Sequence, residues 1–286
     1  MVLSGFPTQV LEACAKAVPP GVPVCPVTPA AETVDRLFSY RHEPLIFVCA
    51  NIFKAIAFFK AFSPGDFFGE FRAKKTVIFA DAAKPVWQDF AKFIIPLVDA
   101  YVVADCAMTP LPAEKWIPNV YLPIPESEWA SETGEKVDDV VFYGSVKLYK
   151  ERQEVLDYLR GQGVPVLSGG GMEQGYPLDF LAAMRRARIT LNFSNCNTGA
   201  GANMHHVKGR IWEAAVSRTL VVETANPVTP KLFTPDEMIW FESQEELPAL
   251  LRKLLVDDKL RFQMTSRMFE KAAQLVKPEV FWTKIS

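Results

Sequence analysis

The sequence predicts an α/β protein made of two Rossmann-like domains, each with a doubly wound parallel sheet, facing across a cleft. Short continuous apolar runs such as LIFVC at residues 45–49 alternate with helical patterns along the whole chain. Such runs are typical of parallel strands buried on both faces, and their alternation with helices is typical of doubly wound sheets. With 286 residues, 49% of them hydrophobic, the chain is long enough for two ordinary domains.

The first predicted domain is residues 1–125. The apolar runs predict strands at residues 1–3, 22–27, 45–49, 77–80, 101–104 and 119–125, and helices at 8–18, 31–40 and in the remaining gaps. Ligands of doubly wound sheets bind outside the carboxyl ends of the strands. The turns after Leu3, Cys49 and Ala80 are therefore expected to face a ligand, and to select the acceptor if this is a transferase.

A linker is expected at residues 126–139 (ESEWASETGEKVDD), where apolar periodicity gives way to a charge run. The second predicted domain is residues 140–286, and its last helix can return to the first domain. The patterns predict strands at 140–143, 164–167, from 189, up to 223 and at 238–241, and helices at 148–160, 177–187, around 208–216, 227–233, 244–256 and 257–277.

Composition and charge favour a small-molecule partner. A net charge of −2 and a pI near 6.0 provide no overall footprint for nucleic acid, although a local basic cleft is compatible with them. Five scattered cysteines without metal-ligand spacing indicate a reducing compartment, and no spanning helix or signal peptide is recognised. We therefore expect a cytoplasmic protein.

Residues 51–75 combine six phenylalanines after position 55 with five cations. This composition suits a weak contact with a membrane or a lipid-linked acceptor. The alternative is a core helix followed by a loop that packs its own aromatics, and two acidic residues that interrupt the basic face favour this alternative.

The stretch 189–224 predicts a strand, a Gly- and Asn-rich loop, a short helix and a second strand. Free N–H groups and the positive dipole end of that helix, with Lys208 and Arg210 in its first turn, suit a phosphate. The alternative is a solvated helix end. Within the same helix, Glu213 either pairs with Arg210 on the surface or binds a ligand such as a diol, because its neighbours are largely apolar.

A second anion-binding turn is predicted at Gly144-Ser145, which follows a strand and precedes a helix that starts with cations. These cations also suit a solvated face. The three histidines lack zinc-type spacing, and no GxSxG or Asp-x-Asp occurs. We expect no metal and no cofactor, so a bound diphosphate would be neutralised by protein cations and helix dipoles.

Residues 207–255, which begin VKGRIWEAAVSRTLVVET, resemble the second half of GT-B glycosyltransferases. They are most similar to the CgeB-like spore-maturation branch, in which a K-G-R-[VI]-[FW]-E-A turn and helix precede a strand. Residues 138–159 and 187–195 are similar to that family's strand–Gly–Ser–helix segment and to the strand before its donor loop. Residues 1–125 match only in plan.

The resemblance implies transfer of a sugar from a nucleoside-diphosphate sugar, such as a UDP-sugar, to an acceptor. Lys208 and Arg210 would bind the diphosphate and assist its departure as the catalytic residues, and Glu213 would bind the ribose. Transfer would be metal-independent, with retention of anomeric configuration. The chain departs from the E-x7-E pattern of the large retaining group, since His205 replaces its first glutamate.

The resemblance also assigns smaller roles to three turns. Gly144 and Ser145 would lie at the phosphate or sugar edge, and Gly169 and the Asn192–Ser194 turn, which includes Ser194, near the base. Two other functions stay open. One is a non-catalytic or structural protein on a degenerate GT-B scaffold, and the other is a GT-B-like nucleotide-sugar epimerase.

Overall fold

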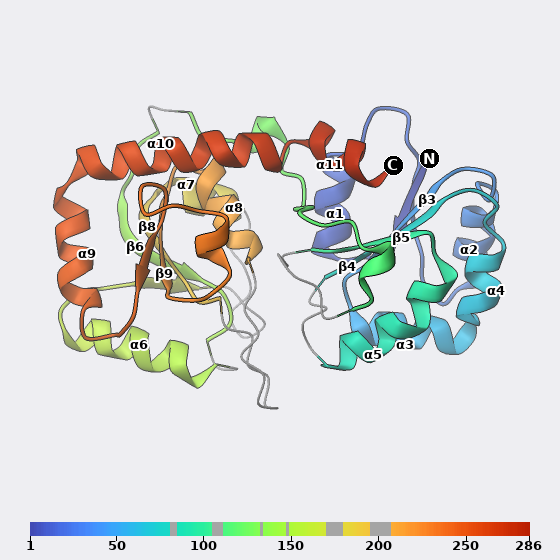
Figure 1. The fold of residues 1–286 in the computed structure, drawn as a ribbon, viewed down its shortest axis with the longest axis horizontal. Coiled ribbons are helices and arrows are strands. Elements are labelled where there is room, and N and C mark those ends of the chain that lie inside the picture. The colour runs from blue at the N-terminus through green and yellow to red at the C-terminus, as the bar shows by residue number, and fades with distance from the viewer. Residues whose placement is uncertain (81–84, 105–110, 132–133, 147–148, 170–179, 195–206) are drawn as a thin grey trace. The chain divides into compact units, whose positions relative to one another are not determined.

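The computed structural model describes residues 1–80, 85–104, 111–131, 134–146, 149–169, 180–194 and 207–286. The chain forms two compact units (Figure 1). Unit 1 comprises Met1–Pro125 and Leu275–Ser286, and unit 2 comprises Glu126–Gln274. The predicted fold class is confirmed, since each unit holds a parallel five-stranded sheet among its described residues.

Unit 1 carries its sheet in the order β2-β1-β3-β4-β5. Its strands are β1 (Val2–Gly5), β2 (Val24–Pro26), β3 (Leu45–Cys49), β4 (Lys75–Phe79) and β5 (Ala100–Val103). Its helices are α1 (Gln9–Lys16), α2 (Ala31–Phe38), α3 (Ile52–Ala61), α4 (Pro64–Gly69), α5 (Pro85–Ile94) and α11 (Pro278–Ile285).

Unit 2 carries its sheet in the order β10-β9-β8-β6-β7. Its strands are β6 (Asp138–Tyr143), β7 (Leu167–Gly169), β8 (Ala187–Asn192), β9 (Leu220–Thr224) and β10 (Ile239–Phe241). Its helices are α6 (Lys150–Gly161), α7 (Phe180–Arg185), α8 (Gly209–Val216), α9 (Leu247–Val256) and α10 (Asp258–Leu275), the last of which runs one residue past Gln274.

Both sheets have the same winding. Read from β2 and from β7, each places its second strand first, then its first, third, fourth and fifth strands in chain order. The strand order reverses between β1 and β3 in unit 1 and between β6 and β8 in unit 2. In such sheets the ligand crevice lies at the carboxyl ends of the two strands that flank this switch point.

Alternate residues of the strands build two separate cores in unit 1. In β3, Leu45, Phe47 and Cys49 join one buried cluster, whereas Ile46 and Val48 join the cluster on the other face. Both faces of the sheet are therefore covered, which explains why the sequence shows a continuous apolar run instead of alternation.

The phenylalanines of residues 51–75 belong mainly to one of these cores. Phe58, Phe67, Phe68 and Phe71 are buried, and two further rings, at positions 59 and 62, pack against them. Phe53 is instead 81% exposed on α3. The core accounts for most of the aromatic content of this segment, and the membrane contact stays a prediction.

The C-terminal helix α11 packs on the sheet of unit 1. Trp282 Nε1 donates to Ala17 O at 2.6 Å, and Thr76 Oγ1 donates to Ile285 O at 3.2 Å. The sequence pattern predicts one long terminal helix to about residue 277. This prediction is confirmed by α10, which ends at Leu275, whereas α11 was not predicted; Pro278, at the first position of α11, disfavours a helical conformation in the residue before it and so separates the two helices.

Two predictions at the level of elements are wrong. Residues 119–125 do not form a strand, since Pro118, Pro123 and Pro125 lack the N–H groups that a ladder requires. The strand expected at 164–167 is β7, which begins only at Leu167.

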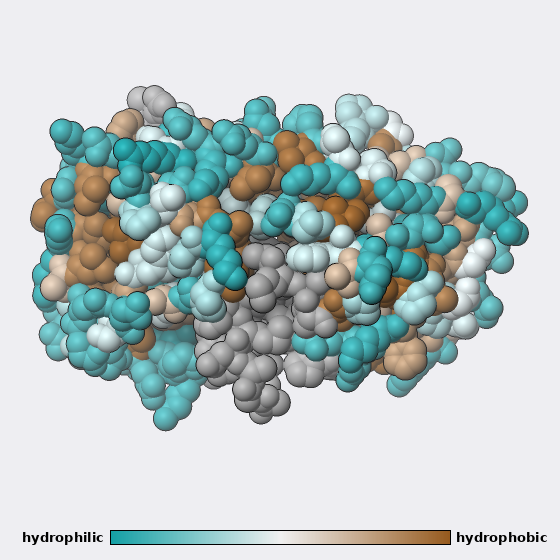
Figure 2. All heavy atoms as spheres, in the orientation of Figure 1, coloured by the Kyte–Doolittle hydropathy of each residue, from teal (hydrophilic) through white to brown (hydrophobic). Residues whose placement is uncertain are grey.

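The surface visible in Figure 2 is mainly hydrophilic, with a hydrophobic area over α9. Among the described residues, a search for helices with the length and hydropathy of a membrane span finds none.

Candidate functional site

The switch point of unit 2 brings several predicted site residues together. Gly144 follows β6 directly, and Asn192 is the last residue of β8. Gly169 ends β7, and its carbonyl oxygen accepts a hydrogen bond from Gly144 N at 2.9 Å. These residues therefore lie at the carboxyl ends of three neighbouring parallel strands, as the sequence pattern predicts.

Arg210, in the first turn of α8, reaches across this edge of the sheet. Its Nη1 donates to Asn192 Oδ1 at 2.8 Å, and its guanidinium carbon lies 4.9 Å from the centroid of the Phe142 ring. A Cβ atom added to Gly144 would overlap Arg210 Nη2 and lie 3.3 Å from its Cζ. The space that Gly144 leaves free is thus filled by the guanidinium of Arg210.

Asn192 connects Arg210 to a buried carboxylate. Its Nδ2 donates to Glu223 Oε1 at 2.6 Å, across the β8–β9 register that pairs the two residues. Glu223 Oε2 accepts from Thr229 Oγ1 at 2.6 Å and from Asn226 Nδ2 at 2.9 Å. Glu223 therefore anchors a hydrogen-bonded chain that ends in the guanidinium at the switch point.

Glu223 has no solvent exposure, and burial raises its pKa from 4.5 to about 7. Hydrogen bonds from Thr229, Asn226 and Asn192 act in the opposite direction, because each donor stabilises the ionised carboxylate. Trp240 Nε1 donates to Thr229 Oγ1 at 2.8 Å and closes the network on β10. The charge of this carboxylate is consequently poised near neutral pH.

The Gly144-Ser145 turn is stabilised by a hydrogen bond from Arg152 of α6. Arg152 is 4% exposed, its Nη1 donates to Ser145 O at 3.0 Å, and its guanidinium lies 3.7 Å from the Tyr149 ring centroid. Lys150 is exposed and pairs with Glu154 at 3.2 Å. Arg152 therefore stabilises the turn, and Lys150 pairs within its own helix. Lys147, the third cation expected near this turn, lies outside the described residues.

The amino end of α8 is as the βαβ pattern predicts, with one adjustment. The helix begins at Gly209, so Lys208 is its N-cap residue, immediately before the first turn. Glu213 lies in the middle of the helix and is half-buried, between Trp212 and Ala214, which are buried. Its role in binding a diol stays a prediction.

The remaining predicted positions lie close to β8 or outside the described residues. Ser194 is fully buried two residues beyond the end of β8. The Gly- and Asn-rich loop, with His205, falls in residues 195–206, which are not described. Residues 170–171 after β7 also lie outside the described residues. Within the described part of the chain, no group of three or more His, Cys, Asp or Glu residues could hold a metal ion.

Comparisons with known proteins bear on the family and the fold of the chain. Residues 146–279 match a family model described as glycosyl transferase-like. A comparison of the sequence with curated proteins finds no match.

The structure of Anabaena HepE in complex with UDP-glucose covers 99% of this chain and 97% of its own, with a TM-score of 0.64 at 12% identity. T4 phage BGT in complex with UDP-glucose covers 100% of both chains, with a TM-score of 0.61 at 13% identity. The chain has the GT-B fold. Staphylococcus aureus TarM shares the fold over 88% of this chain and 58% of its own, with a TM-score of 0.58 at 11% identity.

The sequence did not identify the residues that orient Arg210, which are Asn192 and Glu223. Glu223 was visible only as the polar end of the apolar run LVVET, and Asn192 only as part of a turn. The available signal was a carboxylate inside a buried strand, which is stable only with hydrogen-bonding partners. Asn192 comes from the neighbouring strand and is identified only by the register of the sheet, whereas Asn226 and Thr229 come from the segment that follows β9.

Proposed function

We propose that the chain is a glycosyltransferase that binds a nucleoside-diphosphate sugar, such as a UDP-sugar, at the carboxyl ends of β6 and β8. The family match over residues 146–279 and the GT-B fold support a nucleotide-sugar glycosyltransferase. The similarity of residues 207–255 to the CgeB-like branch remains part of the proposal.

The orientation of Arg210 carries the proposal. Its guanidinium is fixed by Asn192 and by the ring of Phe142, beside the turn at Gly144. A cation that is held in place before the ligand arrives stabilises a developing diphosphate without reorganisation, and guanidinium suits phosphate oxygens geometrically. We assign Arg210 to the diphosphate on this ground.

Lys208 and the first N–H groups of α8 supply the rest of the positive potential. In the proposed reaction, the bond from the anomeric carbon to the diphosphate breaks, and a bond from the same carbon to a nucleophilic atom of the acceptor forms, with the acceptor's proton passing to the diphosphate or to solvent. Negative charge grows on the departing phosphate. Lys208 and Arg210 stabilise that charge, so we expect transfer without a metal ion. Retention of anomeric configuration and a hexosyl donor belong to the same proposal, and Glu213 would bind the ribose.

The first experiment is a thermal-shift screen of the full chain with UDP, GDP, ADP and dTDP. One nucleotide is expected to stabilise the wild type, and Arg210→Ala is expected to weaken its binding roughly 10- to 100-fold, as for a lost hydrogen bond to a charged group. Arg160→Ala is the matched control, because Arg160 pairs with Asp157 on the exposed side of α6. Stabilisation by no nucleotide would refute the proposal.

Turnover separates the remaining alternatives. A transferase is expected to hydrolyse its nucleotide sugar slowly without acceptor and to keep this activity in EDTA. Product analysis by NMR distinguishes a released sugar from an epimerised nucleotide sugar. Binding without any change to the nucleotide sugar would indicate a non-catalytic GT-B protein.

A further inference from the structure

The hydrogen-bonded chain behind Arg210 has a fixed direction from donor to acceptor. A guanidinium has only N–H donors, so the end of the Asn192 amide that faces Arg210 must be Oδ1, which accepts from Nη1 at 2.8 Å. The other end, Nδ2, therefore faces Glu223 and donates to its Oε1 at 2.6 Å. The orientation of Asn192 thus requires that Glu223 Oε1 accepts a hydrogen bond.

The second oxygen of Glu223 is also surrounded by donors. Asn226 Oδ1 accepts from the backbone N–H groups of Val228 and Thr229, at 3.0 and 2.9 Å. The Nδ2 end of Asn226 is thereby fixed toward Glu223 Oε2, 2.9 Å away. Thr229 Oγ1 accepts from Trp240 Nε1 at 2.8 Å and donates to the same Oε2 at 2.6 Å. These are the contacts of an ionised carboxylate, and a proton on Oε2 would face donors.

Protonation of Glu223 is instead accommodated at Oε1, where the Asn192 amide can turn. Rotation of this amide by half a turn would bring its Oδ1 to the new O–H group of Glu223 and its Nδ2 to Arg210. Nδ2 and Nη1 both carry hydrogen, so two donors would then meet. The guanidinium would lose the hydrogen bond that holds it beside Gly144.

The surroundings of Glu223 allow this proton to exchange near neutral pH. Burial raises its pKa to about 7. The hydrogen bonds that oppose this rise come from neutral side chains of β8, of β10 and of the segment after β9: Asn192, Trp240, Asn226 and Thr229. The charged group linked to them is Arg210 of α8, through Asn192. Glu223 is therefore mainly ionised above about pH 7 and mainly protonated below it.

We propose that Glu223 is a positioning residue for the donor diphosphate: in its ionised form it fixes the Asn192 amide and thereby orients Arg210. This inference rests on the proposed function, because Arg210 is the cation assigned to the diphosphate. Uptake of one proton from solvent by Glu223 Oε1 turns the amide and releases Arg210. The affinity for the nucleotide sugar therefore falls as the pH falls.

The test is calorimetric titration of the full chain with UDP-glucose, GDP-glucose, ADP-glucose and dTDP-glucose from pH 5.5 to pH 8.5. The diphosphate of a nucleotide sugar is a diester and keeps a constant charge over this range, unlike a terminal phosphate. For the compound that binds, the affinity of the wild type is expected to fall about 10- to 30-fold from pH 8.5 to pH 5.5. The reason is that the apparent affinity follows the fraction of molecules in which Glu223 is ionised.

Two variants alter the carboxylate or its donors. Glu223→Gln replaces one acceptor oxygen by an NH₂ group, which either meets the donors of Asn226 and Thr229 or turns the Asn192 amide. It is expected to bind about tenfold more weakly than wild type at pH 8.5 and to lose the pH dependence. Thr229→Val removes one donor to the ionised carboxylate, so the midpoint of its profile is expected to move to higher pH.

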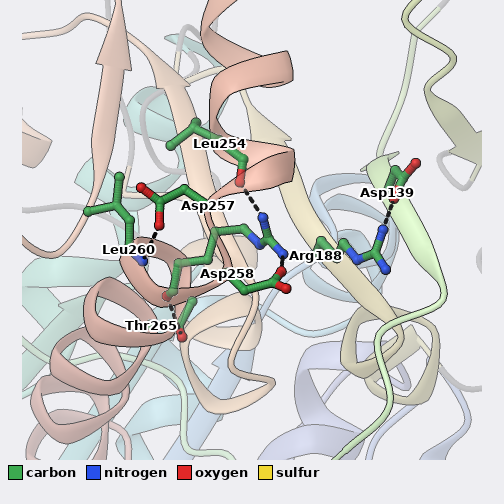
Figure 3. Close-up of polar contacts among 8 residues, drawn as sticks. Asp139, Arg188, Leu254, Asp257, Asp258, Leu260 and Thr265 are labelled. Atoms are coloured by element: carbon green, nitrogen blue, oxygen red, sulfur yellow. Dashed lines mark hydrogen bonds and ion pairs between the residues drawn. The ribbon is translucent and has the colours of Figure 1, made fainter.

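Two controls make the same carboxylate-to-amide change elsewhere in unit 2. Glu237→Gln alters a largely buried carboxylate that pairs with Lys271 of α10 at 2.5 Å. Asp139→Asn alters the ion pair with Arg188, which joins β6 and β8 near their amino ends (Figure 3). Both controls are expected to keep the pH profile of the wild type.

NMR of protein labelled with ¹⁵N-asparagine observes the amide directly. The side-chain signal of Asn192 is assigned by its absence from Asn192→Ser. It is expected to titrate with a midpoint near pH 7 in the wild type and to stay constant in Glu223→Gln. A residue that only stabilised the fold would not produce this titration.

The outcomes separate this inference from the proposed function. If none of the nucleotide sugars binds, the proposed function fails, and this inference fails with it. If one binds with the same pH profile in wild type and Glu223→Gln, or if the Asn192 signal does not titrate, only this inference is overturned. Melting temperatures identify a variant that fails to fold, and the wild-type profile, the remaining variant and the Asn192 signal then decide.

Discussion

The replacement Glu223→Gln tests the buried network behind Arg210. Glu223 has no solvent exposure and accepts hydrogen bonds from Asn192, Thr229 and Asn226. Burial raises its pKa to about 7 against 4.5 in the unfolded chain. The folded protein therefore binds a proton more tightly at this position than the unfolded chain does.

The sign of the pH effect follows from this difference. Below pH 4.5 both states are protonated, and the stabilising contribution is fully present. Between pH 4.5 and about 7 the unfolded chain loses its proton first, so the free energy of unfolding falls as pH rises. At 1.36 kcal/mol for each pKa unit, the total loss is about 3 kcal/mol, and above pH 7 this contribution no longer changes.

The assay is urea or thermal unfolding of wild type and Glu223→Gln at intervals from pH 4.5 to pH 9. The glutamine has no charge to gain, so the difference in unfolding free energy between the two proteins isolates this one group. For a unit of this size the change is equivalent to roughly 6–12 °C in melting temperature. Parallel pH profiles for the two proteins would refute the assignment.

Three further predictions concern other parts of the chain. Gly144→Ala is expected to displace the guanidinium of Arg210 and weaken nucleotide binding about tenfold in a titration, with a melting temperature near that of wild type. Gly5→Ala is expected to destabilise unit 1 by about 1–3 kcal/mol in urea unfolding, because its Cβ would overlap the facing backbone of β3, whereas Gly69→Ala, with open space around it, is expected to have little effect. Deletion of residues 278–286 is expected to lower the melting temperature of unit 1 and to expose its core to a hydrophobic dye, since α11 covers one face of the sheet.

The sequence predicts the fold well wherever burial alone determines the pattern. The run LIFVC is β3 with both boundaries as predicted, because a strand covered on both faces must be apolar at every position. Residues 119–125 have similar composition but form no strand, since their prolines cannot join a ladder. The end of the long helix before Pro278 is predicted to within two residues, whereas the short helix α11 that follows the proline is not predicted.

The candidate site is predictable only in part. The positions of Gly144, Arg210 and Gly169 follow from the rule that parallel strands end at one edge of a sheet. The link from Asn192 to Glu223, which orients the partner of Arg210, does not follow from this rule, because these two residues are 31 positions apart and meet only through the β8–β9 register. The glycine at 144 was expected to admit a ligand, whereas in the structure its missing side chain makes room for a guanidinium.

The carboxyl end of the sheet in unit 2 combines a cation with a buried carboxylate. Arg210 is oriented by the side-chain amide of Asn192, and this amide is held in turn by the buried carboxylate of Glu223. The orientation of the guanidinium is therefore fixed. This arrangement suits a ligand whose negative charge grows during a reaction, because the guanidinium of Arg210 is already oriented before the charge develops.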